Sequence, residues 1–406
     1  MSSSGPNKAP SNGGLGGRRS QAAACWMPRG ATPMTRQRGF SLMELMMSMA
    51  IATGIFMGMV ALFVQQSKVM QEQNELILLN RESRFGLEHL RADLQSLGSN
   101  TTPNSAVDPL VCVKPDPVLR ILTADIANSH VAAPDLNPHV KPVALTLFGS
   151  LDVKTRYKTA SIDGNKVVLF DDGTLPLTQD DFEAVFAAGR FLRIASASGQ
   201  MMFYPITSAS QGDRSVTVAS AVQRIGNGAT CGYSGLGANY DIDVQNFVRY
   251  RIAPDERPGA PLVSGKPMQS LLVRERLSTD GVTVLGQLLL VENAVDLQLY
   301  DIGMDFDTSP ELVKLKVLPL SEDVVQANGE GFLGSTAAAH PEAMRFLTVK
   351  LSVRSTWPQR DLLHRARDVS WQPLNTWLLP GENNGAHTVV TAASRVALPT
   401  LVSRNL

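Results

Sequence analysis

The most apolar stretch of the chain runs from Phe40 to Val64, and Glu44 is the only charged residue among these 25. The stretch contains no proline, and its Met, Leu, Ile, Ala and Phe residues favour a helix. At about 1.5 Å per residue such a helix is roughly 37 Å long, enough to cross a bilayer core of roughly 30 Å. Residues 40–64 are therefore predicted to form a transmembrane helix.

The more polar stretch that follows, residues 65–97, also lacks proline and predicts that the helix continues in water as an amphipathic helix. Gly98 suits a helix end. Four leucines recur at spacings of three and four and predict an apolar stripe that a sheet must cover, namely Leu87, Leu90, Leu94 and Leu97. Charged residues are expected on or near the opposite face, namely Arg84, Glu88, Arg91 and Asp93.

Residues 98–142 contain several prolines and no clear period, so we expect a loop region with at most a short strand near Leu119–Leu122. From residue 143 onward, short apolar and β-branched segments alternate with turn residues, as in the hairpin turn around Asp163-Gly164-Asn165. Many strands behind one long N-terminal helix predict an α+β protein. The helix would pack on antiparallel β-sheet in an enlarged β-rich domain over 143–406.

The strands are expected at twelve places: Val143–Phe148, Tyr157–Ser161, Lys166–Phe170, Phe191–Ala195, Met201–Ile206, Val216–Ala219, Phe247–Ile252, Leu271–Arg276, Gly286–Val291, Leu297–Tyr300, Phe346–Val353 and Thr388–Val390.

The net charge is zero, but the two sides of the apolar stretch differ. Residues 1–39 carry six basic residues and no acidic one, whereas the rest of the chain has 31 basic and 37 acidic residues, a net charge of −6. Basic residues before a span predict a cytoplasmic N-terminus, with the bulk of the chain across the membrane. No basic surface indicates a nucleic-acid partner.

Glu44 is the residue of the apolar stretch that needs an explanation. A carboxylate near the centre of a membrane helix costs about 2.5–3.5 kcal/mol, and the cost is lower near the end of the span. If the chain were cut after Gly39, Phe40 would carry a free amine. The amine of a neighbouring chain could then pair with Glu44 in an apolar setting, where an unpaired charge is heavily penalised.

The segment Gly39-Phe40-Ser41-Leu42-Met43-Glu44 resembles the prepilin N-terminus of type IV pilins and type II secretion pseudopilins. The resemblance implies cleavage by the prepilin peptidase between Gly39 and Phe40, N-methylation of Phe40, and a role for Glu44 in filament assembly. Residues 1–39 would be the leader peptide. Because Met34 begins a leader of the short type seen in this family, we expect Met34 to be the true start and residues 1–33 to be upstream sequence. The alternative is a genuinely long leader.

The run Arg84–Leu94 resembles the helix end of PilW-type minor pilins, and Phe247–Ile252, Leu271–Glu275 and Leu290–Tyr300 follow in that family's order. This resemblance implies a minor pilin that assembles into a type IV pilus, in a priming or tip complex. Its partners would be other minor and major pilins, the prepilin peptidase and the inner-membrane assembly platform. It would cross the bacterial inner membrane once, with its C-terminal domain in the periplasm, and then enter the filament at the cell surface.

Two other functions stay open on the sequence: a J-like pseudopilin of type II secretion, and a pilus-tip adhesin. Three insertions that the resemblance does not cover, at 125–142, 321–342 and 357–387, are where a partner would bind. No recognisable catalytic motif is present, so neither an enzyme nor a cofactor is expected.

The mature chain would keep two cysteines, Cys112 and Cys231, because Cys25 lies in the leader. An even pair in an oxidising compartment predicts a disulfide, and the alternative is two unpaired buried thiols.

An acidic cluster at Asp301, Asp305 and Asp307, with Asp296 and Glu311 nearby, offers oxygen ligands at close spacing. It is a weak calcium candidate, and the alternative is a solvated acidic loop.

Overall fold

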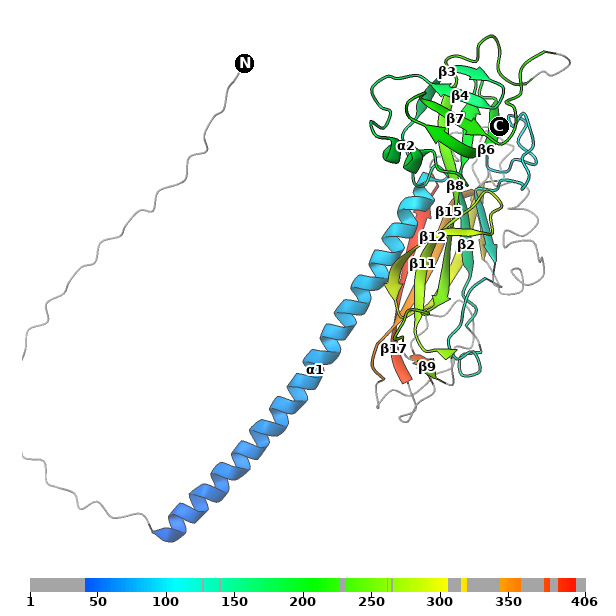
Figure 1. Cartoon of the computed structure of the whole chain (residues 1–406). Coiled ribbons are helices and arrows are strands. Elements are labelled where there is room, and N and C mark those ends of the chain that lie inside the picture. The colour runs from blue at the N-terminus through cyan, green and yellow to red at the C-terminus, as the bar shows by residue number, and fades with distance from the viewer. Residues whose placement is uncertain are drawn as a thin grey trace, which may run out of the picture. The chain divides into compact units, whose positions relative to one another are not determined.

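The computed structural model describes residues 41–98, 100–125, 128–138, 140–226, 231–260, 262–263, 266–305, 315–319, 344–358, 376–379 and 386–398. It divides the chain into two compact units, Met1–Gln66 and Ser67–Leu406. One helix, α1 (Leu42–Ser96), contributes to both, and the remainder is rich in antiparallel strands (Figure 1). The predicted α+β class is confirmed.

In the first unit, α1 carries the apolar stretch. It is long and apolar enough to cross a membrane, and the most apolar part of it is not buried by any other part of the described chain. These side chains therefore need lipid or other helices to cover them.

The first sheet of the second unit is organised around β8 (Asp241–Pro254). The C-terminal half of β8 pairs with β2 (Ala144–Gly149) on one side and with β11 (Ser270–Leu277) on the other. Two strands extend this part of the sheet, β1 (Leu122–Asp125) beside β2 and β12 (Val284–Glu292) beside β11. A separate small ribbon is formed by β9 (Leu262–Val263) and β10 (Lys266–Pro267).

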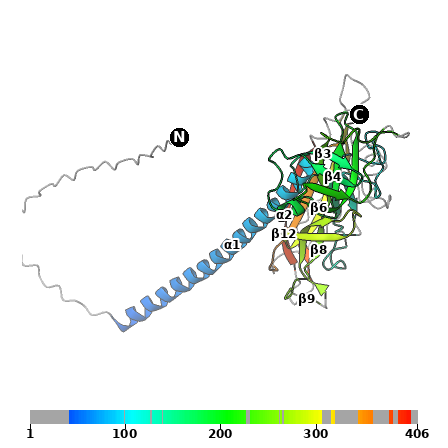
Figure 2. The same ribbon diagram turned by 45° about the horizontal axis from the view of Figure 1, so that its top comes forward.

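The N-terminal half of β8 belongs to a closed ring of antiparallel strands that the sequence did not reveal. The pairings run in order through the other members and return to β8: β3 (Tyr157–Asp163), β4 (Lys166–Leu169), β7 (Ser215–Val218), β6 (Met201–Ser210) and β5 (Phe191–Ala195). A short helix, α2 (Gln179–Val185), lies against β6 (Figure 2). The ring encloses its own apolar core, which includes Phe182, Tyr204 and Ile242.

The second sheet has five antiparallel strands in the order β14-β13-β15-β17-β16. Their bounds are β13 (Ala294–Asp305), β14 (Leu315–Pro319), β15 (Met344–Arg354), β16 (Thr376–Leu378) and β17 (Ala386–Ala397). Described residues of the insertion at 125–142 pack on this sheet, where the side-chain amide of Asn137 exchanges two hydrogen bonds with the backbone of Leu378.

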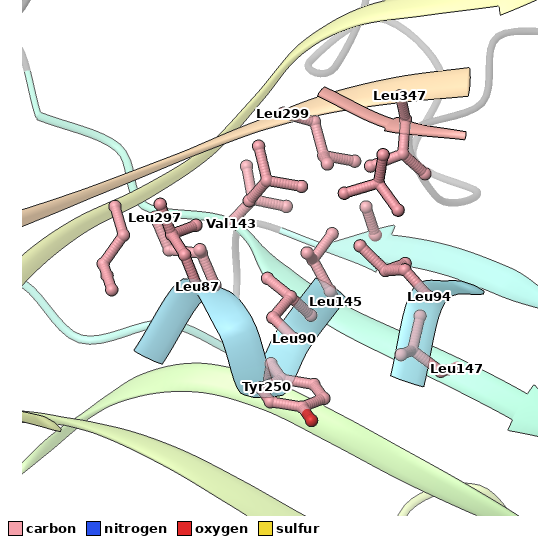
Figure 3. Packing of buried hydrophobic residues seen from close by; sticks show 14 of the residues in the cluster. Leu87, Leu90, Leu94, Val143, Leu145, Leu147, Tyr250, Leu297, Leu299 and Leu347 are labelled. Atoms are coloured by element: carbon pink, nitrogen blue, oxygen red, sulfur yellow. The ribbon is translucent and has the colours of Figure 1, made fainter. Parts of the chain in front are cut away.

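The main core lies where the end of α1 meets both sheets (Figure 3). The predicted stripe of Leu87, Leu90, Leu94 and Leu97 is buried, as expected. Figure 3 shows side chains of this stripe among Leu145 and Leu147 of β2, Tyr250 of β8, Leu297 and Leu299 of β13, and Leu347 of β15.

Gly86 marks the closest approach of α1 to the sheets. A Cβ added at Gly86 would lie 2.6 Å from Val291 Cγ2 and 2.8 Å from Leu351 Cδ2. Glycine destabilises a helix by about 1 kcal/mol relative to alanine. Its presence at position 86 is explained by the small space that the side chains of Val291 and Leu351 leave.

Gly86→Leu is therefore expected to destabilise the protein by about 1–3 kcal/mol, because overpacking a filled core forces neighbours out of their preferred rotamers. Equilibrium denaturation measures the effect. Gly86→Ala, which adds one carbon next to movable side-chain ends, is the matched control and should cost less. Equal stabilities of the leucine variant and the wild type would show that the helix does not pack this closely.

A pair of basic side chains is buried at the end of β15. Arg354 donates to the backbone oxygens of Ser355 (2.9 Å) and Met268 (3.1 Å), and burial lowers its pKa to about 10. His387 on β17 places its Nδ1 2.9 Å from the Ser355 oxygen. Burial, followed by the charge of Arg354, lowers the pKa of His387 to about 4.

His387 should make the protein sensitive to mild acid. Its folded pKa of about 4 lies below the unfolded value of about 6.5, so the unfolded chain binds the extra proton in between. The contribution is fully present above about pH 6.5, and about 2–3 kcal/mol is lost as the pH falls toward 4. Urea denaturation at pH 7.5 and 5 measures this loss. His387→Gln should reduce it, whereas a variant of the exposed His89, His89→Gln, should leave it unchanged.

Candidate functional site

The candidate site is the start of α1, where Ser41 and Glu44 hold the first turn of the helix. The backbone N–H of Met43 donates to Ser41 Oγ (3.4 Å), and the backbone N–H of Ser41 donates to Glu44 Oε2 (3.4 Å). This reciprocal arrangement is a capping box in which Ser41 Oγ accepts from the second helical residue instead of the third, and it satisfies two backbone donors that a helix start leaves without partners. Glu44 is therefore bonded locally, at an end of the helix where a negative charge is favourable.

The side chains around Glu44 are apolar and exposed in the first unit, among them Leu42, Met43 and Met47. Further along the same helix, a Cβ added at Gly54 or Gly58 would meet no atom within 4 Å. This helix segment can accept close neighbours along its length. Gly39 and Phe40, the predicted cleavage pair, lie outside the described residues.

At the other end of α1, Asp93 was expected on or near the face opposite the leucine stripe, but it is buried. One of its oxygens, Oδ2, accepts hydrogen bonds from Tyr250 Oη (2.6 Å) and Arg274 Nε (2.9 Å). Nη2 of Arg274 also donates to Asp152 Oδ1 (2.7 Å), and Asp152 in turn bonds Asn246 (3.2 Å). This polar network fastens the end of α1 to β8 and β11.

Burial and the neighbouring charges together keep Tyr250 and Arg274 in the protonated forms that donate hydrogen bonds. Burial, followed by the charge of Asp93, holds the pKa of Tyr250 well above its ordinary value, so its hydroxyl stays a donor. Burial works to lower the pKa of Arg274, but Asp93 and Asp152 outweigh it and hold that pKa above its ordinary value. The spacing of the leucines gave no signal for this network, because Asp93 lies beside the stripe and its partners come from distant strands.

The structure places Cys112 and Cys231 as a disulfide with Cα atoms 5.5 Å apart, across a separation of 119 residues. The backbone of Cys112 donates to the Met201 oxygen (2.9 Å), so one end of the bond is held against β6. The bond joins the segment after α1 to the segment that leads into β8.

Cys112→Ser is expected to lower the free energy of unfolding by about 2–4 kcal/mol, because a long loop is released in the unfolded chain. Denaturation of the oxidised protein, compared with the variant, measures this loss. Reduced and oxidised wild-type protein should differ in mass by two hydrogens. Identical masses would show two free thiols, which is the alternative that the sequence left open.

The structure describes only part of the acidic cluster that the sequence singled out. Asp301 lies on β13, with its Oδ2 3.9 Å from Arg395 Nη2 on β17, and Asp305 is the last residue of β13. Asp307 and Glu311 lie outside the described residues. Among the residues that the structure describes, no group of three acidic, histidine or cysteine side chains is placed to hold a metal ion. The calcium site stays a sequence prediction.

In a comparison with known families, residues 34–62 match the prokaryotic N-terminal methylation motif. No curated protein and no solved structure matches the chain significantly. The matched segment spans Gly39, Phe40 and Glu44 and most of the apolar stretch. The methylation motif, the long apolar helix and the antiparallel strands together support a type IV pilin-like protein, anchored in a membrane and then assembled with other pilins into a filament.

Proposed function

We propose that this protein is a minor pilin of the PilW type, which assembles through residues 40–64 into a type IV pilus as part of a priming or tip complex. The methylation motif over residues 34–62 carries the proposal, and it suggests a structural rather than an enzymatic role. The motif implies processing by the prepilin peptidase and association with other pilins. The PilW assignment rests on the resemblance of the later segments.

In this proposal the peptidase cuts after Gly39, and Phe40 becomes the N-methylated first residue. Glu44 then pairs with the terminal amine of a neighbouring subunit. A charge in an apolar filament core is tolerated when it is paired, so this contact would fix the register of one subunit against the next. The capping box supports the proposal because it holds the Glu44 carboxylate at the first turn, next to the new terminus.

The basic residues of segment 1–39 and the acidic remainder support an orientation with the C-terminal domain in the periplasm. In this orientation, the inner-membrane assembly platform would add the subunit to the filament. Residues 65–97 then carry the helix out of the membrane, and the domain over 143–406 is displayed on the filament. The disulfide suits that compartment.

The test is the mass of the N-terminal peptide from protein extracted from membranes of cells with an active prepilin peptidase. The expected result is a chain that begins at N-methylated Phe40 and that co-purifies with tagged sibling pilins. A chain that keeps its arginine-bearing leader in those cells would overturn the proposal.

A J-like pseudopilin of type II secretion is the second candidate, because the same methylation motif serves both kinds of filament. Co-purification separates the two functions. Recovery with pilus subunits favours the minor pilin, whereas recovery with secretion pseudopilins favours the alternative.

A further inference from the structure

A groove with both charged and apolar lining residues lies in the second unit, beside the sheet-facing side of α1. From Leu79 onward this side is buried and mostly apolar, through Leu87, Leu90 and Leu94. One turn earlier, Glu75 is half-buried and its neighbours on the helix are exposed. The groove has a volume of about 640 Å³ and is lined by Lys68, Gln71, Glu72, Asn74, Glu75 and Leu78 of α1 and by Thr356, Trp357 and Pro358 after β15.

The far wall of the groove is a segment held in place by hydrogen bonds. Ser355 is fully buried, and its Oγ donates to the Trp357 oxygen (2.9 Å) and accepts from the Thr388 N–H of β17 (3.1 Å). The Ser355 N–H donates to the Thr388 oxygen (2.7 Å). These bonds fix the backbone around Trp357, while the residue as a whole is 73% exposed. An exposed aromatic ring on a fixed backbone can take a ligand with little loss of entropy.

The near wall of the groove, formed by α1, contains a carboxylate oxygen without a hydrogen-bond donor among the described residues. Glu75 Oε1 is buried and has no hydrogen-bond partner in the described part of the chain. An ionised carboxylate can only accept, so a positively charged donor satisfies it best. Glu72 adds a second carboxylate one turn away, and no ion pair within the described residues joins Lys68 to either glutamate. The charged residues that line the groove are thus one cation, Lys68, and two anions, Glu72 and Glu75.

We propose that this groove binds an arginine or lysine side chain of a partner polypeptide that lies along α1. The cation would donate to Glu75 and Glu72 while it stacks on the face of Trp357, a combination of charge-assisted hydrogen bonds and cation–π contact. Arginine suits the site better, because its planar guanidinium can serve a carboxylate and an aromatic ring together. The partner polypeptide is another subunit of the filament, and this identification rests on the proposed function.

The first test uses full-length protein in detergent and a small probe, Nα-acetyl-arginine N-methylamide, with binding followed by saturation-transfer NMR. Saturable binding is expected, and the citrulline analogue, which has the same shape without the charge, should bind about tenfold more weakly. Glu75→Gln and Trp357→Ala should each weaken binding of the arginine probe by about tenfold. Equal binding of the two probes would overturn the proposal.

Glu256→Gln is the matched control, because Glu256 is an exposed glutamate away from the groove, and this variant should bind the probe as the wild type does. Thermal melting of each variant identifies any loss of fold. Ser355→Ala is the positioning variant: it removes the side-chain hydrogen bonds that fix the backbone around Trp357, so it should weaken binding although the chain keeps both carboxylates and the indole. If Glu75→Gln and Glu256→Gln behave alike, the groove is not the binding site.

The second test places a photo-crosslinker at position 71 in filament-forming cells. A crosslink to another filament subunit is expected. A protein that is processed and present in the filament but gives no such crosslink would overturn the partner and leave the pilin function intact. A protein that is never processed would overturn the pilin function itself, while the probe-binding result would still stand.

Discussion

Asp93→Ala is expected to lower the free energy of unfolding of the second unit by about 3 kcal/mol, because it strips two buried donors of their acceptor at once. Tyr250 Oη and Arg274 Nε both donate to the same Asp93 oxygen. Arg274 would keep Asp152, but its charge would be only half balanced in a site whose side chains are largely buried.

Urea denaturation at pH 7.5 measures the effect. Glu88→Ala is the matched control: Glu88 lies on the same helix and pairs with Arg91 (3.5 Å), but both side chains are well exposed, so the cost should be under about 1 kcal/mol. Asp93→Asn keeps an acceptor for Tyr250 and should fall between the two. If Asp93→Ala costs no more than Glu88→Ala, the network does not hold α1 on the sheets.

Much of the fold could be predicted because it follows repeating patterns. The leucine spacing placed the buried side of α1, and β5 was predicted with its observed bounds at Phe191–Ala195. Long strands were predicted too short: the end of β17 was expected at Val390 but lies at Ala397. Part of β17 is exposed or half-exposed and gives no alternating signal.

The closed ring that includes β8 could not be predicted from the sequence, because it depends on pairing between strands that are distant along the chain. The first half of β8 carries charged or polar residues such as Asp243 and Gln245, which do not resemble a buried strand. These side chains are satisfied by long-range partners: Gln245 accepts from Thr101 (2.8 Å), and Asp243 pairs with Arg193. Burial nevertheless raises the pKa of Asp243 despite that cation. No local pattern encodes such pairs.

At the candidate site, sequence reasoning and structure supply different parts. The sequence singles out Glu44 because a lone carboxylate in an apolar stretch is costly. The structure shows the capping box, although Ser41 followed three residues later by glutamate was a signal that predicts it. Glu44 thus has two possible roles, a local one within the helix and an intersubunit one, and a comparison of variants can separate them.

Glu44→Ala is expected to reduce incorporation into the filament by about two orders of magnitude. An unpaired terminal amine in an apolar core costs about 3 kcal/mol, and each 1.4 kcal/mol is a factor of ten. The measurement is the ratio of variant to wild-type protein in sheared filaments from cells that express both. Glu88→Ala, on the exposed face of the same helix, should enter as the wild type does.

Ser41→Ala separates the two roles of Glu44, because it weakens the cap but keeps the carboxylate. Loss of a serine cap costs about 1 kcal/mol of helix stability, so incorporation should fall by less than about tenfold. If capping were the main role of Glu44, Glu44→Ala would also lose no more than the roughly tenfold expected for a lost cap. A much larger loss for Glu44→Ala requires that the carboxylate meet a charge outside its own helix. In a mature chain that begins at Phe40, the amine of a neighbouring subunit is the charge that the proposed processing supplies.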